Sequence, residues 1–255
     1  MKRKAFIGML AAVLSLALCV FGAACGISEA EQGVAEIDGV QYNDLQAAFD
    51  AAKDGDTVKL LADYTIAEDV EDTAEARLVI NSKITLDFGS YRIIAPAKMS
   101  EYGKNFTALY IKKSTIFKAN ENGGIVCELS EDGIGPYGVN ITDEAEVTIT
   151  GGTYVGGGTA FQVQLGKLEI LGGKFSCNPF DAPYGYNFLI NCIDSAYKNG
   201  TAVVGIKGGS FANFNPANCK AEGENTNFVA DGYTVEDLGE TVEYRYVVKA
   251  AELTE

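Results

Sequence analysis

Short segments of alternating apolar and polar residues recur along the chain, and each is followed by a glycine pair, one variable residue and an aromatic residue. Alternation with a period of two is typical of a β-strand with one buried face, so the first and third residues of each segment are predicted to point inward. Two successive glycines let the backbone turn through positive φ at low steric cost, after which the aromatic residue returns to the interior. The three clearest copies are Val147–Tyr154, Leu168–Phe175 and Val204–Phe211.

The spacing of these copies indicates a stacked, repetitive fold. The offset is 21 residues from Gly151 to Gly172 and 36 residues from Gly172 to Gly208. These offsets suit one coil and one coil with an insertion of about 15 residues, which would lie between Cys177 and Ala202. We therefore predict an all-β solenoid, a parallel β-helix. A β-sandwich is the alternative, although its hairpins would favour Asn-Gly or Asp-Gly turns over Gly-Gly.

Weaker copies extend the pattern toward the N-terminus. Residues Ile84–Tyr91 keep the inward pair, the second glycine and the aromatic residue, and further coils fit between residues 91 and 147, around Ile111 and Gly123–Val126. The residues predicted to point inward in the clear copies are Val147, Ile149, Leu168, Ile170, Val204 and Ile206.

The stacked coils expose an apolar cross-section at each end, so atypical caps are expected there. At the N-terminal end, Asn43 is predicted to cap a short helix with Gln46 at its third position, and Gly55 to stop that helix. At the C-terminal end, residues 227–235 and 244–248 are predicted to form a terminal pair of strands. The residues predicted to form the apolar face of the helix are Leu45, Ala48, Phe49 and Ala52.

These caps and the Gly-Gly coils resemble the pectate-lyase-like right-handed parallel β-helix proteins of bacterial surfaces and their phage-encoded homologues. The likeness covers nearly all of the chain after residue 36 and rests on architectural motifs, so it implies a right-handed β-helix and leaves activity open. The segments that carry it, besides the coils, are Ile37–Phe49, Asp54–Leu61, Phe228–Tyr233 and Tyr246–Val248.

The first residues of the chain have the features of a secretory signal. Three basic residues at positions 2–4 precede an uncharged run from Ala5 to Ala24, which ends in the small residues Gly22, Ala23 and Ala24. Cys25 follows, as in a bacterial lipobox, although Gly22 stands where leucine is usual. We predict a signal peptide over 1–24, lipidation of Cys25, a tether over 25–35 and a β-helix domain over 36–255 with an insertion at about 178–201. Ordinary cleavage that leaves a free Cys25 is the alternative.

Four cysteines remain after the signal and Cys25, and they allow three pairings. Cys177 and Cys192 bracket part of the predicted insertion, so a disulfide between them would staple it. Free thiols stacked inside the coils are the alternative for Cys127, Cys177, Cys192 and Cys219.

The net charge of the chain limits the classes of partner that it is expected to bind. Loss of the three basic residues of the signal lowers the net charge from −15 to −18, with 35 acidic residues in the whole chain. Such a chain repels nucleic acid and anionic lipid, so we predict no nucleic-acid partner and contact with a membrane through the lipid anchor only. The acidic residues are scattered, which is typical of a solvated surface.

Candidate chemistry is sparse. The chain has no histidine, which excludes Ser-His-Asp and Cys-His arrangements and His-ligated metals. Lyases of the β-helix type use Arg or Lys with calcium, but Arg77, Arg92 and Arg245 have no cluster of aspartates near them in sequence. We therefore predict no catalytic residue, cofactor or metal site, while convergence of two carboxylates from different coils stays open.

The predicted insertion is the best candidate for binding. Insertions in repeat folds emerge as loops, often on the binding face, and aromatic rings beside Asn and Asp suit the faces and hydroxyl edges of sugars. The alternative is that these rings pack beneath the loop, and the lack of tryptophan favours it. The predicted ligand-binding residues are Phe180, Asp181, Tyr184, Tyr186, Asn187 and Phe188.

Together these features predict a secreted bacterial surface lipoprotein that binds neutral glycans or a surface protein without catalysis. A polysaccharide lyase or glycoside hydrolase of the β-helix type is the first alternative. A structural or phage-derived appendage is the second. Convergence of acidic residues in one groove would distinguish them.

Overall fold

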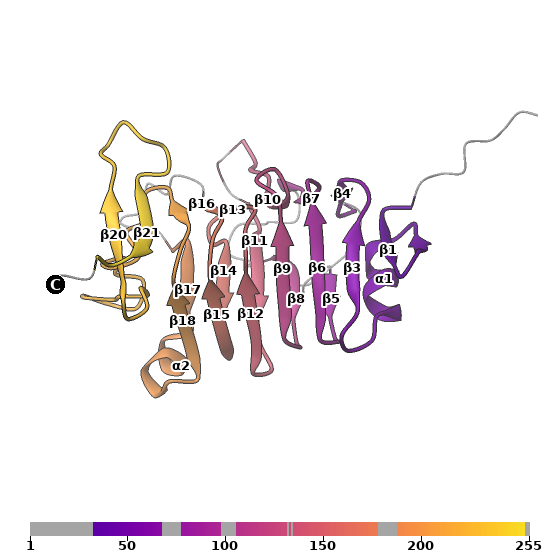
Figure 1. Ribbon diagram of the computed structural model, residues 1–255, viewed down its shortest axis with the longest axis horizontal. Coiled ribbons are helices and arrows are strands. Elements are labelled where there is room, and N and C mark those ends of the chain that lie inside the picture. Colours follow the sequence, from indigo (N-terminus) through magenta and orange to yellow (C-terminus); the bar gives the residue numbers. More distant parts are fainter. Residues whose placement is uncertain are drawn as a thin grey trace, which may run out of the picture. The chain divides into compact units, whose positions relative to one another are not determined.

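The computed structural model describes residues 33–67, 78–97, 106–131, 133, 135–177 and 188–252. These residues are mostly β, and their strands stack side by side in chain order, from the indigo end with α1 to the yellow end with β20 and β21 (Figure 1). The prediction of an all-β protein with stacked strands is confirmed.

The described strands form three sheets, named A, B and C. Sheet A contains β1 (Ala35–Ile37), β2 (Val40–Tyr42), β3 (Thr57–Leu60), β6 (Ile84–Gly89), β9 (Thr115–Ala119), β12 (Ala145–Ile149), β15 (Gly166–Ile170) and β18 (Ala202–Ile206). Sheet B contains β4 (Tyr64–Thr65), β7 (Arg92–Ala95), β10 (Gly124–Cys127), β13 (Thr153–Gly156), β16 (Lys174–Cys177), β19 (Ser210–Phe211), β20 (Tyr233–Asp237) and β21 (Tyr246–Ala250). Sheet C contains β5 (Leu78–Ile80), β8 (Thr107–Ile111), β11 (Tyr137–Ile141), β14 (Phe161–Val163) and β17 (Ile190–Cys192).

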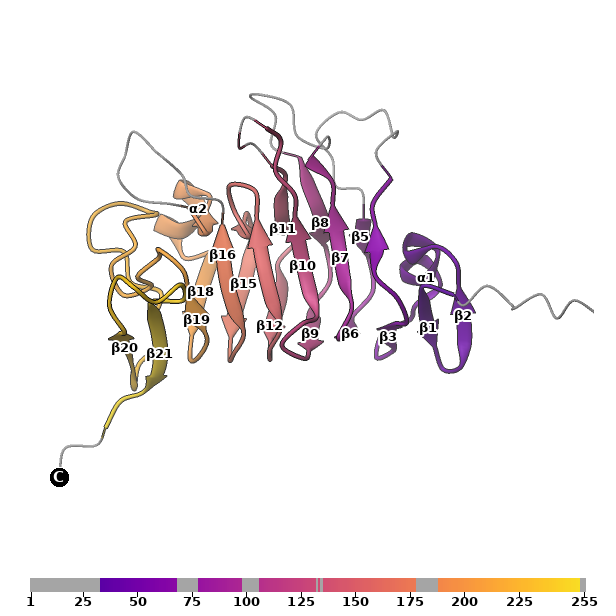
Figure 2. The same ribbon diagram turned by 90° about the horizontal axis from the view of Figure 1, so that it is seen from above.

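From β3 to β19 the chain visits sheets A, B and C in turn, so every third strand returns to the same sheet. We call three such successive strands a coil. Neighbouring strands from different coils pair in parallel, for example β12 with β15 and β13 with β16. Among the described strands, antiparallel pairing occurs only at the ends, where β1 pairs with β2 and β3, and β21 pairs with β19 and β20. Figure 2 shows the same succession of strands from above.

The interior is filled by rows of side chains in register from coil to coil. One row on sheet A consists of Leu86, Phe117, Ile149, Ile170 and Ile206, all fully buried. On sheet B the repeated aromatic residues stack, with ring centroids 5.4 Å apart for Tyr154 and Phe175 and 5.0 Å apart for Phe175 and Phe211. Stacked rows of this kind remove large apolar areas from water, which is the main stabilising contribution in such a fold.

The glycine pairs form the corners between sheets A and B. The second glycine of each clear copy has positive φ, 102° at Gly152, 115° at Gly173 and 99° at Gly209. The predicted corner is therefore confirmed. Of the residues predicted to point inward, Val204 is only partly buried, and the other five are fully buried.

The weak copy at Ile84–Tyr91 differs from its prediction. Tyr91 is 39% exposed, and Ile93 takes the place of the inward aromatic residue, in register with Ile125 and Tyr154. The register between β6 and β9 shifts between Asp87 and Gly89. Phe88 continues the alternation of Ile84 and Leu86 and is buried in the core, whereas Tyr91 is not.

The predicted N-terminal helix is present as α1 (Leu45–Ala51), with its predicted apolar face buried. Its N-cap is Asp44 and not Asn43, because the Asp44 carboxylate accepts a hydrogen bond from the backbone N–H of Ala47 at 2.8 Å. The helix ends at Ala51 with Ala52 as its C-cap, so it stops before the predicted stop at Gly55.

Side chains satisfy backbone groups of the two outermost strands of sheet C. At β5, the Gln46 side chain accepts from the Val79 N–H at 2.8 Å and donates to its carbonyl at 3.1 Å. At β17, Glu222 accepts from the Cys192 N–H at 2.6 Å, and burial raises the pKa of Glu222. Polar caps of this kind protect sheet edges that would otherwise leave unpaired backbone groups.

The C-terminal strand pair is present as β20 and β21, shifted a few residues from its predicted bounds. The interval predicted as an insertion, 178–201, contains β17, which pairs in register with β14, and the helix α2 (Asp194–Asn199). Part of that interval is thus an ordinary strand of the repeat.

Candidate functional site

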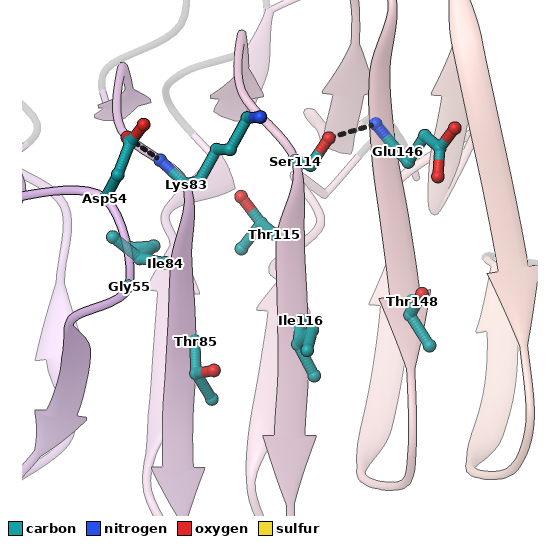
Figure 3. Close-up of a pocket in the computed structure, with 10 residues that line it drawn as sticks. All are labelled: Asp54, Gly55, Lys83, Ile84, Thr85, Ser114, Thr115, Ile116, Glu146 and Thr148. Carbon is teal, nitrogen blue, oxygen red and sulfur yellow. Dashed lines mark hydrogen bonds between the residues drawn. The ribbon is translucent and has the colours of Figure 1, made fainter.

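A groove lies on the outer face of sheet A and has a volume of about 590 Å³ (Figure 3). It crosses β6, β9 and β12 and reaches the turn before β3. We call it the sheet-A groove. Its lining residues are Asp54, Gly55, Lys83, Ile84, Thr85, Ser114, Thr115, Ile116, Glu146 and Thr148.

The strand register places the outward side chains of this groove in two rows. Thr85, Ile116 and Thr148 are direct neighbours on successive strands. Lys83 and Ser114 lie two residues before Thr85 and Ile116, directly before β6 and β9, as Figure 3 shows. Because strands in a sheet are about 4.8 Å apart, the rows repeat the same spacing from coil to coil.

Hydrogen bonds hold the upper row in place. The Asp54 carboxylate accepts from the Lys83 backbone N–H at 2.8 Å, and the Ser114 hydroxyl oxygen accepts from the Glu146 N–H at 3.2 Å (Figure 3). Each bond joins neighbouring coils, so this rim of the groove is fixed by the coil stacking.

The floor of the groove is apolar at its centre and hydroxylic on either side. Ile116 is 45% exposed and lies between Thr85 and Thr148. Thr115 faces the interior, where it is buried and its hydroxyl donates to the Lys113 carbonyl. Ile116 therefore offers a small apolar platform, flanked by hydroxyl groups on the same face.

Two ion pairs lie outside the groove, one on β6 and β9 and one between β15 and the residue after β18. Lys118 Nζ lies 2.9 Å from Asp87, and Lys207 Nζ lies 2.7 Å from Glu169. The hydrogen bond from Lys207 lowers the pKa of Glu169. These pairs balance positive and negative charge on the outer face of sheet A, although the chain as a whole is strongly acidic.

The groove contains two carboxylates, but they are far apart. Asp54 precedes β3 and Glu146 begins the outward row on β12, so three strand spacings, about 14 Å, separate their positions. Glycoside hydrolysis uses carboxyl pairs separated by about 5 to 9.5 Å. Within the described part of the chain, no group of three or more Cys, Asp or Glu side chains is placed to hold a metal ion.

Most of the site residues predicted from sequence lie outside the described residues. These are Cys25, Phe180, Asp181, Tyr184, Tyr186 and Asn187. Phe188 is described, is partly buried and packs against the hydrophobic core.

The four cysteines for which disulfides or free thiols were the alternatives are free thiols in this structure. Cys127, Cys192 and Cys219 are buried, whereas Cys177 is partly exposed. Burial raises the pKa of Cys127 and of Cys177 to about 12 and that of Cys219 to about 11, so these thiols stay protonated at neutral pH.

Sequence reasoning missed the sheet-A groove. The relevant signal is the outward position in each strand segment, where Thr85, Ile116 and Thr148 are uncharged while positions farther along the strands carry Asp87 and Lys118. That signal becomes readable only when the segments are aligned in register. Comparison with protein-family models, curated proteins and solved structures gives no match for this chain.

Proposed function

We propose that this protein is a secreted, lipid-anchored surface protein with a right-handed parallel β-helix, and that its sheet-A groove binds a neutral glycan without catalysis. The cyclic order of sheets A, B and C supports a β-helix. The likeness of the caps and Gly-Gly coils to pectate-lyase-like proteins supports the right-handed form.

The observation that carries the binding proposal is the mixed floor of the groove. A sugar ring presents an apolar face and hydroxyl edges, and Ile116 between two threonines offers matching surfaces. Predominantly apolar walls with a few placed polar groups are typical of small-ligand sites. The repeat of about 4.8 Å along the stack also suits successive rings of an extended glycan.

Charge favours a neutral ligand over an anionic one. The net charge of −15, or −18 once the signal is removed, opposes the approach of polyanions. At the rim, Lys83 offers hydrogen-bond donors and Glu146 offers acceptors, and both are exposed. Donors and acceptors together match hydroxyl groups, which act in both ways.

The alternative of a polysaccharide lyase or hydrolase is less well supported by this groove. Asp54 is bound to the Lys83 backbone and is about 14 Å from the position of Glu146. That separation suits two independent polar contacts better than paired acid and base groups.

A glycan array with two matched variants tests the binding proposal. Ile116→Thr should weaken binding roughly fivefold, because it removes apolar contact at the centre of the groove. Val203→Thr is the control, since Val203 is 43% exposed on the same face of sheet A but does not line the groove. Equal binding by both variants would overturn the proposed site.

Further arms of the same experiment separate the alternatives. Loss of binding in a Tyr184→Ala, Tyr186→Ala double variant, with Ile116→Thr unaffected, would move the site to the 178–201 interval. Release of reducing ends or unsaturated products would establish an enzyme. A wild-type protein that binds no glycan would favour a structural appendage.

The proposed anchor has its own test. Among the described residues, no helix is long and apolar enough to cross a membrane. We expect Cys25→Ser to abolish incorporation of a fatty-acid probe and to release the protein from the membrane fraction. Unchanged labelling and fractionation would show that lipidation at Cys25 is wrong.

A further inference from the structure

A second groove, of about 540 Å³, lies on the outer face of sheet B. We call it the sheet-B groove. Its floor comes from β13 and β16, where Val155 is paired with Ser176. One wall is the segment 238–245, which joins β20 to β21. The groove is separate from the sheet-A groove, since the two share no lining residue.

The wall from the β20–β21 segment is well braced. At its base, the Arg245 guanidinium donates to both carboxylate oxygens of Asp237, at 2.6 and 2.7 Å. Leu238 N–H donates to the Arg245 carbonyl at 2.9 Å, and Val242 N–H donates to the Gly239 carbonyl at 3.2 Å. A bidentate Arg–Asp pair fixes geometry as well as charge, so these bonds hold the segment itself in one conformation.

Two chemical features meet in this groove. Leu129 and Val242 are exposed apolar side chains that line it, and Val155 adds a partly buried one to the floor. Glu240 and Glu243 stand at the same groove; the Glu240 carboxylate lies 3.8 Å from Arg245 Nη1 and its side chain stays 88% exposed, so it can also contact a ligand. Apolar walls beside exposed carboxylates match a ligand with an apolar stem and a cationic end.

Lysine and arginine side chains have that composition, because their methylene stems pack on apolar surfaces while the charged head stays in water. We propose that the sheet-B groove binds a basic peptide segment of another protein, with Lys or Arg stems on Leu129 and Val242 and their charges at Glu240 and Glu243. The acidic net charge of the chain favours the approach of such a segment. This inference does not depend on glycan binding at sheet A.

Titration with a short synthetic peptide of alternating arginine and leucine, followed by isothermal calorimetry on the full chain, tests the proposal. The double variant Glu240→Gln, Glu243→Gln should bind it about five- to tenfold more weakly, and added salt should reduce this difference. Val242→Ser should also weaken binding. Glu224→Gln, an exposed carboxylate that does not line the groove, is the matched control and should bind like the wild type.

Two control ligands make the outcome decisive. The same peptide with citrulline in place of arginine should lose affinity to the same extent as the double variant. Spermine, which has the charge without the leucines, should bind more weakly than the peptide. The proposal is overturned if the wild type binds no peptide, if the double variant binds as tightly as Glu224→Gln, or if spermine matches the peptide. Thermal melts of each variant confirm that these losses do not come from unfolding.

Discussion

The inner and outer faces of sheet A are built from the same strands, yet they differ in the residue types that occupy them. The inner row is Leu86, Phe117, Ile149, Ile170 and Ile206. The neighbouring outer row is Thr85, Ile116, Thr148, Glu169 and Gly205. The inner residues are all large and apolar, because each must fill space between neighbouring coils. The outer residues are, in order, a hydroxyl residue, an apolar residue, a hydroxyl residue, a charged residue and a glycine. The strands keep the same register along this row.

This difference shows that contact with neighbouring coils, and not membership of a strand, limits what a position tolerates. Burial of a large apolar side chain contributes about 1.5 to 3 kcal/mol, whereas an exposed ion pair contributes about 0 to 1 kcal/mol. The outer face is therefore free to carry binding chemistry at little cost in stability. Three predictions test this comparison.

The largest effect is expected inside the coils. Phe117→Ala should lower the free energy of unfolding by about 3 to 5 kcal/mol, because it leaves a cavity between Phe88 and Tyr154. The Phe117 ring centroid lies 5.4 Å from that of Phe88 and 6.1 Å from that of Tyr154. Urea unfolding measures the change, with Ile116→Ala, the next residue on the same strand, as the control. Equal losses for both variants would contradict the comparison.

A smaller effect is expected at a corner. Gly208→Ala should destabilise the protein by about 1 to 3 kcal/mol, since its added Cβ would lie 2.2 Å from the Leu171 carbonyl oxygen and the backbone would have to shift. Gly205→Ala is the matched control, because a Cβ there meets nothing within 4 Å. Thermal melts decide between them. The assignment of Gly208 to a tightly packed corner fails if the two variants have the same melting temperature.

The smallest effect is expected for an outer ion pair, and it should depend on pH. Lys207 lowers the pKa of Glu169 in the folded protein below its unfolded value. The pair therefore stabilises the fold above the unfolded pKa, and this stabilisation is lost as pH falls through the folded pKa. Glu169→Gln should cost up to about 1 kcal/mol at neutral pH and nothing in strong acid.

Unfolding of Glu169→Gln at neutral and acidic pH provides the measurement. Glu146→Gln is the control, because Glu146 is exposed on the same face and has no ion pair among the described residues. A loss for Glu169→Gln that persists unchanged in acid would point to packing instead of charge.

Local features of the sequence were sufficient to predict the glycine corners and the buried rows of side chains. Alternation along Val147–Ile149 and Leu168–Ile170 identifies the buried face, since side-chain direction in a strand follows from position alone. The positive φ of Gly152 and Gly173 was likewise predictable, because glycine adopts it at low cost. The fold class and the helix that caps the first coil follow from these short-range signals.

Long-range placement was decided by the tertiary structure. Tyr91 is exposed, and Ile93 on β7 takes the inward position in register with Ile125, a pairing that alternation within one segment does not specify. The sheet-A groove joins Asp54 to Lys83 across 29 residues and Ser114 to Glu146 across 32. Which of these residues become neighbours depends on the length of each whole coil, and therefore on every connection in between. Strand direction and corners are local properties of the chain, whereas a surface formed by several coils exists only after they have stacked in register.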